Sequence, residues 1–407
     1  MQLAIYLVGA QQASTWFDTI PAQIGKVLGM HRQCSLRTRK GIPMSVGIAI
    51  LGASGAVGST LAVHILRSGL LEPQDCLMLV GHGAHSIERR LMPVRVDLLD
   101  AFDDERVQIS IVPDIDEFEA DIVVVAAGET KSTENATRRD LAVVNLPIFR
   151  QIAQECAARL PRALFIVVSN PVELAVQVLT EVVDRQRVIG MGSQQDSLRF
   201  ARAVATDLDV SRRHVRASVF GEHGLHMVPL WQTVELLINS PRHQASLARL
   251  SAKAMEIPLM TRVTDLMGEV EQRLAAGRLA DAYDATCRAL PDARIVVQPT
   301  ITAQSMHSTP NATANATLQL IIAALTADKR RVHGQVKLAG EALGIDGVCG
   351  FPIMIGREGW RLWDTECLDD FGRAAVASSA DAISSFLNRV LLAPESSRDW
   401  LCAEAAA

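Results

Sequence analysis

The feature that most constrains the fold is an apolar run that leads straight into a glycine-spaced turn. Residues 46–51 read VGIAIL, typical of a buried parallel strand, and residues 59–68 have the pattern of a helix. In such a turn the first glycine permits the sharp bend, the middle one lets the backbone approach a pyrophosphate, and the last lets the helix pack against the strand. The sequence therefore predicts a dinucleotide site at Gly52, Ser54, Gly55, Ala56, Val57 and Gly58.

Further apolar runs follow in the first half of the chain. They cover residues 76–80, 107–112, 121–126 and 163–168. Each run is short and largely apolar, as strands buried on both faces of a sheet are. Together with the first strand they predict an α/β fold with a doubly wound parallel sheet.

The composition is that of a globular protein and argues against several classes of partner. The 407 residues leave room for two domains, and 49% hydrophobic with 21% charged residues is typical of soluble chains. The net charge is −5 and no basic block dominates, so we expect no nucleic-acid partner. No apolar run reaches the roughly 18–20 residues of a membrane-spanning helix, so we expect no membrane partner. Seven cysteines without CxxC or metal-like spacing predict reduced thiols, a cytoplasmic location and no metal site.

The candidate chemistry is concentrated in residues 188–229. Asp196 and Arg199 are three positions apart, so on a helix they project from one face. His223 follows a strand-like run and is flanked by glycines. A carboxylate, a guanidinium and an imidazole are the groups needed to hold a carboxylate substrate and to move a proton beside it.

This block resembles the catalytic segment of the lactate/malate dehydrogenase family, in which LDSxRF is followed by GEHG; here the text is QDSLRF and GEHG. The resemblance implies an N-terminal Rossmann domain and a C-terminal α+β catalytic domain. It implies hydride transfer between NAD(P) and a 2-hydroxy acid/2-keto acid pair. His223 would exchange the hydroxyl proton, Asp196 would hold the imidazole in one tautomer, and Arg199 would bind the 1-carboxylate through two hydrogen bonds.

A segment of the first half resembles the family's substrate lid. Residues 138–141 read RRDL, and the resemblance implies that Arg138 polarises the substrate carbonyl. Thr137 is expected to cap the helix that starts there. Lys131 falls where the family chooses its substrate, with arginine for the second carboxylate of malate and glutamine for lactate. Lysine could meet a second carboxylate as a point charge rather than a fork. We therefore expect malate/oxaloacetate as the substrate pair, with lactate or another 2-hydroxy acid as the alternative.

A second segment, residues 169–173, reads SNPVE and resembles the family's SNPVD, with Glu173 in place of aspartate. The resemblance implies that Asn170 hydrogen-bonds the reacting oxygen of the substrate. The same comparison predicts cofactor contacts at Ala127, Gly128, Asn145 and Ser169.

The choice between NAD and NADP depends on the end of the second strand. An acid usually stands there in NAD-preferring enzymes and binds the ribose hydroxyls. Here Gly81 and His82 take that place, with Arg89 and Arg90 nearby. Removal of the carboxylate removes its repulsion of a 2′-phosphate, and a cation can pair with that phosphate, so we expect NAD or NADP.

The second half of the chain departs further from the family. Residues 240–300 form an insertion with helical spacing at 247–267 and 270–290, and Pro258 should break the first helix. Thr309, or the neighbouring Ser308, is a candidate for the substrate wall.

The predicted organisation has four parts. Residues 1–43 form a loosely attached extension or a targeting segment, and 44–189 form the dinucleotide domain. Residues 190–395 form the catalytic domain, and 396–407 form a tail. The resemblance implies a homodimer or homotetramer. The altered lid and the insertion leave one alternative of another class, a non-catalytic NAD(P)-binding regulatory protein.

Overall fold

The structure, a computed structural model, describes residues 45–81, 87–102, 107–115, 118–130, 137–304, 309–326, 329–356, 358–363 and 368–392. All of them belong to one compact unit, Ser45–Ala407. The predicted extension at 1–43, the tail at 396–407, and the candidates His82 and Lys131 lie outside the described residues. The limits predicted for the two domains stay a prediction.

The predicted strands of the first half form a parallel sheet, and the predicted α/β fold class is confirmed. Its strand order is β3-β2-β1-β4-β5-β6, the doubly wound order in which a dinucleotide-binding crevice forms where the order reverses. Every position of the two central strands β1 and β4 is buried. The strands are β1 (Gly47–Leu51), β2 (Cys76–Val80), β3 (Gln108–Val112), β4 (Ile122–Val125), β5 (Leu164–Val167) and β6 (Val188–Gly190).

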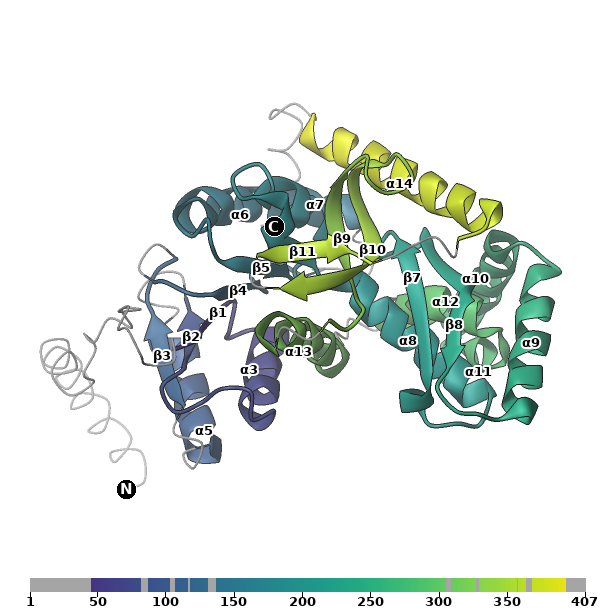
Figure 1. The fold of residues 1–407 in the computed structure, drawn as a ribbon, viewed down its shortest axis with the longest axis horizontal. Helices are drawn as coiled ribbons and strands as arrows, with labels where there is room; N and C mark the ends of the chain where they lie inside the picture. Colours follow the sequence, from purple (N-terminus) through teal and green to yellow (C-terminus); the bar gives the residue numbers. More distant parts are fainter. Residues whose placement is uncertain are drawn as a thin grey trace, which may run out of the picture. The chain divides into compact units, whose positions relative to one another are not determined.

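Helices connect these parallel strands and cover the sheet (Figure 1). Helix α3 starts at Ala56, earlier than the predicted start at residue 59, because Gly55 already serves as its extended N-cap. The helices are α3 (Ala56–Arg67), α5 (Met92–Phe102), α6 (Arg138–Gln151) and α7 (Val172–Leu179). Shorter helical turns are η1 (Ile87–Leu91), η3 (Ile152–Cys156), η4 (Ala157–Arg159) and η5 (Arg185–Arg187).

The second half continues the same sheet with antiparallel strands. The junction is the pairing of Gly190 in β6 with Gln335 in β9, and the side chain of Gln335 also accepts a hydrogen bond from the backbone of Ser193 at 2.9 Å. From there the order runs β9-β10-β7-β8, with β11 paired to β10. These strands are β7 (Val215–Gly221), β8 (Met227–Leu236), β9 (Val332–Ala339), β10 (Asp346–Gly356) and β11 (Gly359–Leu362).

Helix α8 packs against β7, and α13 packs against α3 although the two lie far apart in the chain (Figure 1). Among the helices that the structure describes, none is long and apolar enough to cross a membrane. The helical elements are α8 (Gly192–Asp207), η6 (Arg212–His214), α9 (Pro241–Met255), α10 (Leu259–Ala275), α11 (Leu279–Arg288), α12 (Pro291–Gln304), α13 (Pro310–Thr326) and α14 (Asp370–Leu391).

The region predicted as an insertion is helical, and its core is continuous with α8. The break predicted at Pro258 is confirmed, since this residue stands between α9 and α10. The single helix expected over 270–290 is wrong. The chain turns at Gly277 with a φ of 70°, a conformation that favours glycine, and α11 starts after it. The guanidinium of Arg262 holds the carboxylate of Asp292 by two 2.7 Å hydrogen bonds, which ties α10 to α12.

Candidate active site

The three residues predicted for the chemistry meet at the start of α8. The Nδ1 atom of His223 lies 2.6 Å from Oδ2 of Asp196, and Nη1 of Arg199 donates to the other carboxylate oxygen at 2.9 Å. One helical face presents Asp196 and Arg199, as their spacing predicts. The Asp196 carboxylate therefore joins a base to a cation within a single hydrogen-bonded group.

Burial and charge act in opposite directions on Asp196. The residue is fully buried, which by itself raises the pKa of a carboxyl group. The charges and hydrogen bonds of His223 and Arg199 outweigh this effect and hold the pKa of Asp196 below its ordinary value. Asp196 is thus kept as a carboxylate, which is the form that accepts the Nδ1 proton of His223 and fixes the imidazole tautomer.

Arg138, the candidate lid arginine, lies between two carboxylates. Its Nη2 donates to Oε2 of Glu173 at 2.6 Å, and its Nη1 forms an ion pair with Glu222. It is the first residue of α6, and the cap predicted at Thr137 is confirmed by a reciprocal capping box with Asp140. Hydrogen bonds from the side chain and backbone of Thr137 hold the pKa of Asp140 below its ordinary value.

A second group of predicted residues is gathered around Asn145. Its side-chain amide donates to the carbonyl of Asn170 at 2.7 Å, and its oxygen accepts from the backbone of Glu129 at 2.7 Å. It also lies against Gly128, where an added Cβ would come within 3.2 Å of the amide oxygen. Asn145 is fully buried, whereas Asn170 is exposed at the end of β5. Asn145 thus connects the segment after β4 to the backbone of Asn170.

The turn at 52–58 has the geometry of a pyrophosphate cradle. Gly52 has a φ of 82°, and a Cβ there would lie 2.6 Å from the carbonyl oxygen of Ala126. A Cβ on Gly58 would lie 2.7 Å from the α-carbon of Ala53, so a glycine lets α3 pack this closely. Helix α3 begins without a side-chain cap and without an acid in its first turn. Its N-terminal amides therefore fit an anionic phosphate.

The other cofactor candidates lie at the same edge of the parallel sheet. The hydroxyl of Ser169, after β5, donates to the carbonyl of Ala127, after β4, at 2.6 Å. Gly81 follows β2 and donates its backbone N–H to Val112 at 3.0 Å. Within the turn itself, Gly55 and Ala56 are exposed and Ser54 and Val57 are half-buried. These residues follow the carboxyl ends of strands, where ligands of doubly wound sheets bind.

Thr309 is placed against α8. Its hydroxyl accepts from the side-chain amide of Gln195 at 3.3 Å, and the same amide reaches Thr313 at 3.3 Å. Gln195 is buried, precedes Asp196, and is four positions from Arg199 on the same helical face. The unexpected glutamine is therefore a polar link between α8 and the start of α13.

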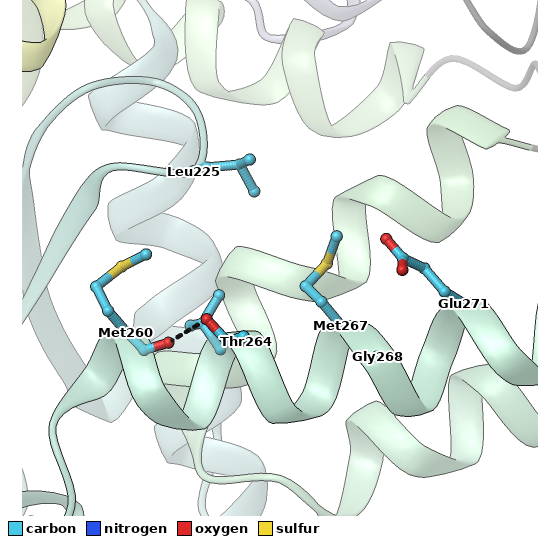
Figure 2. Close-up of a pocket in the computed structure, with 7 residues that line it drawn as sticks. Leu225, Met260, Thr264, Met267, Gly268 and Glu271 are labelled. Carbon is cyan, nitrogen blue, oxygen red and sulfur yellow. Dashed lines mark hydrogen bonds between the residues drawn. The ribbon is translucent and has the colours of Figure 1, made fainter.

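The loop after His223 borders the helical insertion. Figure 2 shows Leu225 on a loop beside α10, with Met260, Thr264, Met267 and Glu271 of that helix on the same side. These residues line a hollow of about 360 Å³. Leu225 is 47% exposed, although it is two residues from the candidate base. Helix α10 thus comes close to the loop that carries His223.

Residue-level prediction missed three participants, namely Glu173, Glu222 and Gly192. In the sequence Glu173 stands out only as a substitution for aspartate, although an acid in the largely apolar sequence of α7 is a signal for a buried partner. Glu222 belongs to the GEHG motif and was given no role. Gly192 lies directly against the imidazole of His223, where no side chain fits.

The chain resembles known proteins over this whole arrangement. Residues 46–190 match the family model described as lactate/malate dehydrogenase, NAD binding domain. A malate dehydrogenase of Methanosphaera stadtmanae is 30% identical over 190 residues, which are 46% of this chain and 58% of that enzyme. The chain therefore spans little more than half the length of that relative.

Two further proteins match over most of the chain. An L-2-hydroxycarboxylate dehydrogenase (NAD(P)(+)) of Methanocaldococcus jannaschii is 27% identical over 353 residues, covering 84% of this chain and 98% of that protein. The crystal structure of Cryptosporidium parvum malate dehydrogenase superposes with a TM-score of 0.66 at 20% identity, covering 86% of this chain and all of that one. The structural likeness establishes a shared fold.

Proposed function

Because the chain belongs to the lactate/malate dehydrogenase family, we propose that it interconverts a 2-hydroxy acid and a 2-keto acid with a nicotinamide cofactor. The observation that carries the proposal is the contact of His223 and Arg199 with the two oxygens of one buried carboxylate, that of Asp196. This places a proton-transfer group and a carboxylate-binding group side by side. A 2-hydroxy acid needs these two groups on adjacent carbons.

His223 acts as the base in the direction of oxidation. Its Nδ1 donates to Asp196, which leaves the lone pair of Nε2 to take the hydroxyl proton. A nicotinamide bound at the 52–58 turn and its neighbouring strand ends would supply the acceptor for the hydride released from the same carbon. The imidazolium that forms is stabilised by the Asp196 carboxylate, and in the reverse direction it returns the proton to the keto oxygen.

Arg199 binds the 1-carboxylate of the substrate. Its bond to Asp196 uses one guanidinium nitrogen, and the guanidinium carries five N–H donors in a planar fork. The remaining donors can hold a carboxylate through two parallel hydrogen bonds. Asn170, exposed at the strand end, and Arg138, on the adjacent lid helix, are assigned to the reacting oxygen.

The cradle at 52–58 is assigned to the pyrophosphate of NAD, with the edge formed by Ala127, Gly128 and Ser169 beneath it. NADP is proposed as a second cofactor, since Gly81 brings no carboxylate to repel a 2′-phosphate. The NAD(P)(+) in the printed name of the Methanocaldococcus relative supports use of both.

Malate/oxaloacetate is the proposed substrate pair, with Lys131 and Thr309 as the candidate specificity residues. Lactate or another 2-hydroxycarboxylate is the alternative, since the two relatives are named for malate and 2-hydroxycarboxylate and the matched family model for lactate and malate. A homodimer or homotetramer in the cytoplasm is proposed on the family resemblance.

The test is an assay of the purified chain with NADH and, separately, NADPH against oxaloacetate, pyruvate and longer 2-keto acids. Oxidation of the reduced cofactor in the presence of at least one acid supports the proposal, and the acid with the highest kcat/KM identifies the substrate. Cofactor binding by fluorescence without turnover across the panel would instead establish the non-catalytic, regulatory alternative.

A further inference from the structure

Arg138 is held on three sides by side chains from three different elements. Oε2 of Glu173, in the first turn of α7, accepts from Nη2, and Oε1 of Glu222, after β7, pairs with Nη1. The guanidinium carbon lies 4.7 Å from the ring centroid of Phe386 in α14, which adds a cation–π contact. Such a cage fixes both the position and the plane of the guanidinium.

The same two carboxylates hold the catalytic loop. Oε1 of Glu173 accepts the backbone N–H of His223 at 2.7 Å, and Oε2 of Glu222 accepts the backbone N–H of His226 at 2.9 Å. All four carboxylate oxygens are therefore engaged, two by Arg138 and two by the ends of the loop 223–226. We call this arrangement the Arg138 clamp, made of Arg138, Glu173 and Glu222.

Because the two carboxylates of the clamp are buried, its three residues depend on one another. The side chain of Glu173 is fully buried and that of Glu222 is 5% exposed, whereas that of Arg138 is 31% exposed. Two carboxylates so far from water depend on a cation and on hydrogen-bond donors to stay ionised. Both carboxylates pair with Arg138. A change at one carboxylate therefore shifts the guanidinium, and this shift weakens the ion pair with the other carboxylate.

The space around the loop leaves little freedom for it to settle elsewhere. A Cβ on Gly224 would lie 2.8 Å from Oε2 of Glu222 and 3.3 Å from Nη1 of Arg138, so the clamp uses the space that this glycine leaves. On the other side, the imidazole of His223 packs against Gly192 of α8. The loop is thus enclosed between the clamp and the catalytic helix.

We propose that Glu173 and Glu222 are positioning residues, which act through Arg138 and the loop backbone to hold the His223 imidazole in register with Asp196. The inference rests on the proposed function for its catalytic consequence. Glu173 stands where the family resemblance predicts an aspartate, and in this chain its carboxylate spans from the His223 amide to the Arg138 guanidinium. The lid helix α6 and the proton-transfer group are therefore mechanically coupled.

The first test measures the loop without any turnover. Hydrogen–deuterium exchange of the peptide covering residues 221–228 is compared between the unaltered chain, Glu173→Gln and Glu222→Gln. Exchange at the amides of 223 and 226 should rise about tenfold, because the charged acceptors are lost. Glu269→Gln is the matched control, since it removes a glutamate–arginine ion pair on the exposed side of α10. Unchanged exchange in both clamp variants would overturn the proposal.

The second test separates positioning from simple stabilisation. Glu173→Gln should lower kcat roughly tenfold to a hundredfold while KM for the keto acid changes less than about threefold, because it displaces the groups assigned to the reacting oxygen and leaves Arg199, assigned to the 1-carboxylate, in place. Glu173→Asp keeps the charge and should recover part of kcat. A variant in which KM alone changes, or in which Asp is no better than Gln, contradicts the positioning role.

A double-variant comparison shows whether Arg138 carries the coupling. The exchange rates of Glu173→Gln, Arg138→Gln and the combined variant should be non-additive, because the residues share one network. Additive effects would refute action through Arg138. If Glu173→Gln does not fold, Glu222→Gln breaks the same clamp at its less buried end and decides the question. If the unaltered chain shows no turnover, the proposed function fails, while the exchange data still decide whether the clamp holds the loop.

Discussion

The imidazole of His223 lies against the backbone of Gly192, so closely that a Cβ on Gly192 would come within 2.6 Å of the Cβ of His223. Gly192 is the first residue of α8, and His223 is held by Asp196 of the same helix and by Glu173 of α7. A side chain at position 192 would therefore displace the imidazole rather than the helix. The position of the His223 imidazole therefore depends on the absence of a Cβ at residue 192.

Replacement of Gly192 by alanine should lower kcat by about tenfold to a hundredfold, since a shift of the base by a fraction of an ångström degrades proton transfer. Cofactor affinity should stay unchanged. The measurement is steady-state kinetics together with a cofactor-binding titration. Gly268→Ala is the matched control: it lies in α10 with nothing within 4 Å of the added Cβ, so it should retain activity and gain roughly 0.5–1 kcal/mol of stability. Equal activity of the two variants would contradict the steric argument.

Replacement of His223 by asparagine should reduce turnover by roughly 10²–10⁴, the usual contribution of a general acid or base, while NADH still binds. Asparagine can keep a hydrogen bond to Asp196 but provides no group that titrates in the required range. Single-turnover kinetics and cofactor fluorescence measure the two effects. His243→Asn in α9, which removes a half-buried histidine bonded to Ser240, serves as the control. A fully active His223→Asn enzyme would remove this residue from the mechanism.

Replacement of Arg199 by lysine should raise KM for the keto acid by about tenfold to a hundredfold and leave the folded state nearly intact. The lysine keeps a charge near Asp196 but loses the second parallel hydrogen bond to the substrate carboxylate. Initial rates over a range of keto acid concentrations, with the melting temperature as the folding control, give the answer. An unchanged KM would show that the 1-carboxylate is bound elsewhere.

The stability of the fold should fall as the pH is lowered below about 6.5, because of His333. This residue is buried in β9 between Gln194 and Ser218, and burial, helped by the charge of Arg331, lowers its pKa to about 3. Between pH 6.5 and about 3 the unfolded chain binds a proton at this histidine that the native chain does not. Each unit by which the pH falls in this range therefore lowers the free energy of unfolding by about 1.4 kcal/mol. Urea unfolding at several pH values measures the slope. His333→Gln should flatten it, and an identical slope would rule out His333 as its source.

Local sequence patterns were enough to predict the parallel half of the sheet and the neighbouring positions of Asp196 and Arg199 on α8. Strand β2 begins and ends at the predicted residues, 76 and 80. The shared helical face of Asp196 and Arg199 follows from their spacing of three residues. Both are determined within a few neighbouring residues. The Ala127–Ser169 contact was also foreseeable, since parallel strands bring their carboxyl ends to one edge.

The Arg138 clamp was not predictable in the same way. Glu173 reaches a backbone amide fifty positions later in the chain, and such a partner is set by the packing of α7 against the sheet rather than by any local pattern. The helix end at Gly277 was missed because a lone glycine in a helical pattern does not by itself specify a left-handed turn.

The loop after β7 is attached to its surroundings by main-chain atoms. The carboxylates of Glu173 and Glu222 accept hydrogen bonds from the backbone N–H groups of residues 223 and 226. Every amino acid except proline has such a backbone N–H. The hydrogen bonds that anchor the loop therefore require the two acids, but they place no requirement on the side chains at 225 and 226. The 47% exposed Leu225 is therefore a side chain that such a loop can change at little cost, and position 225 is a suitable place to graft a spectroscopic probe beside His223.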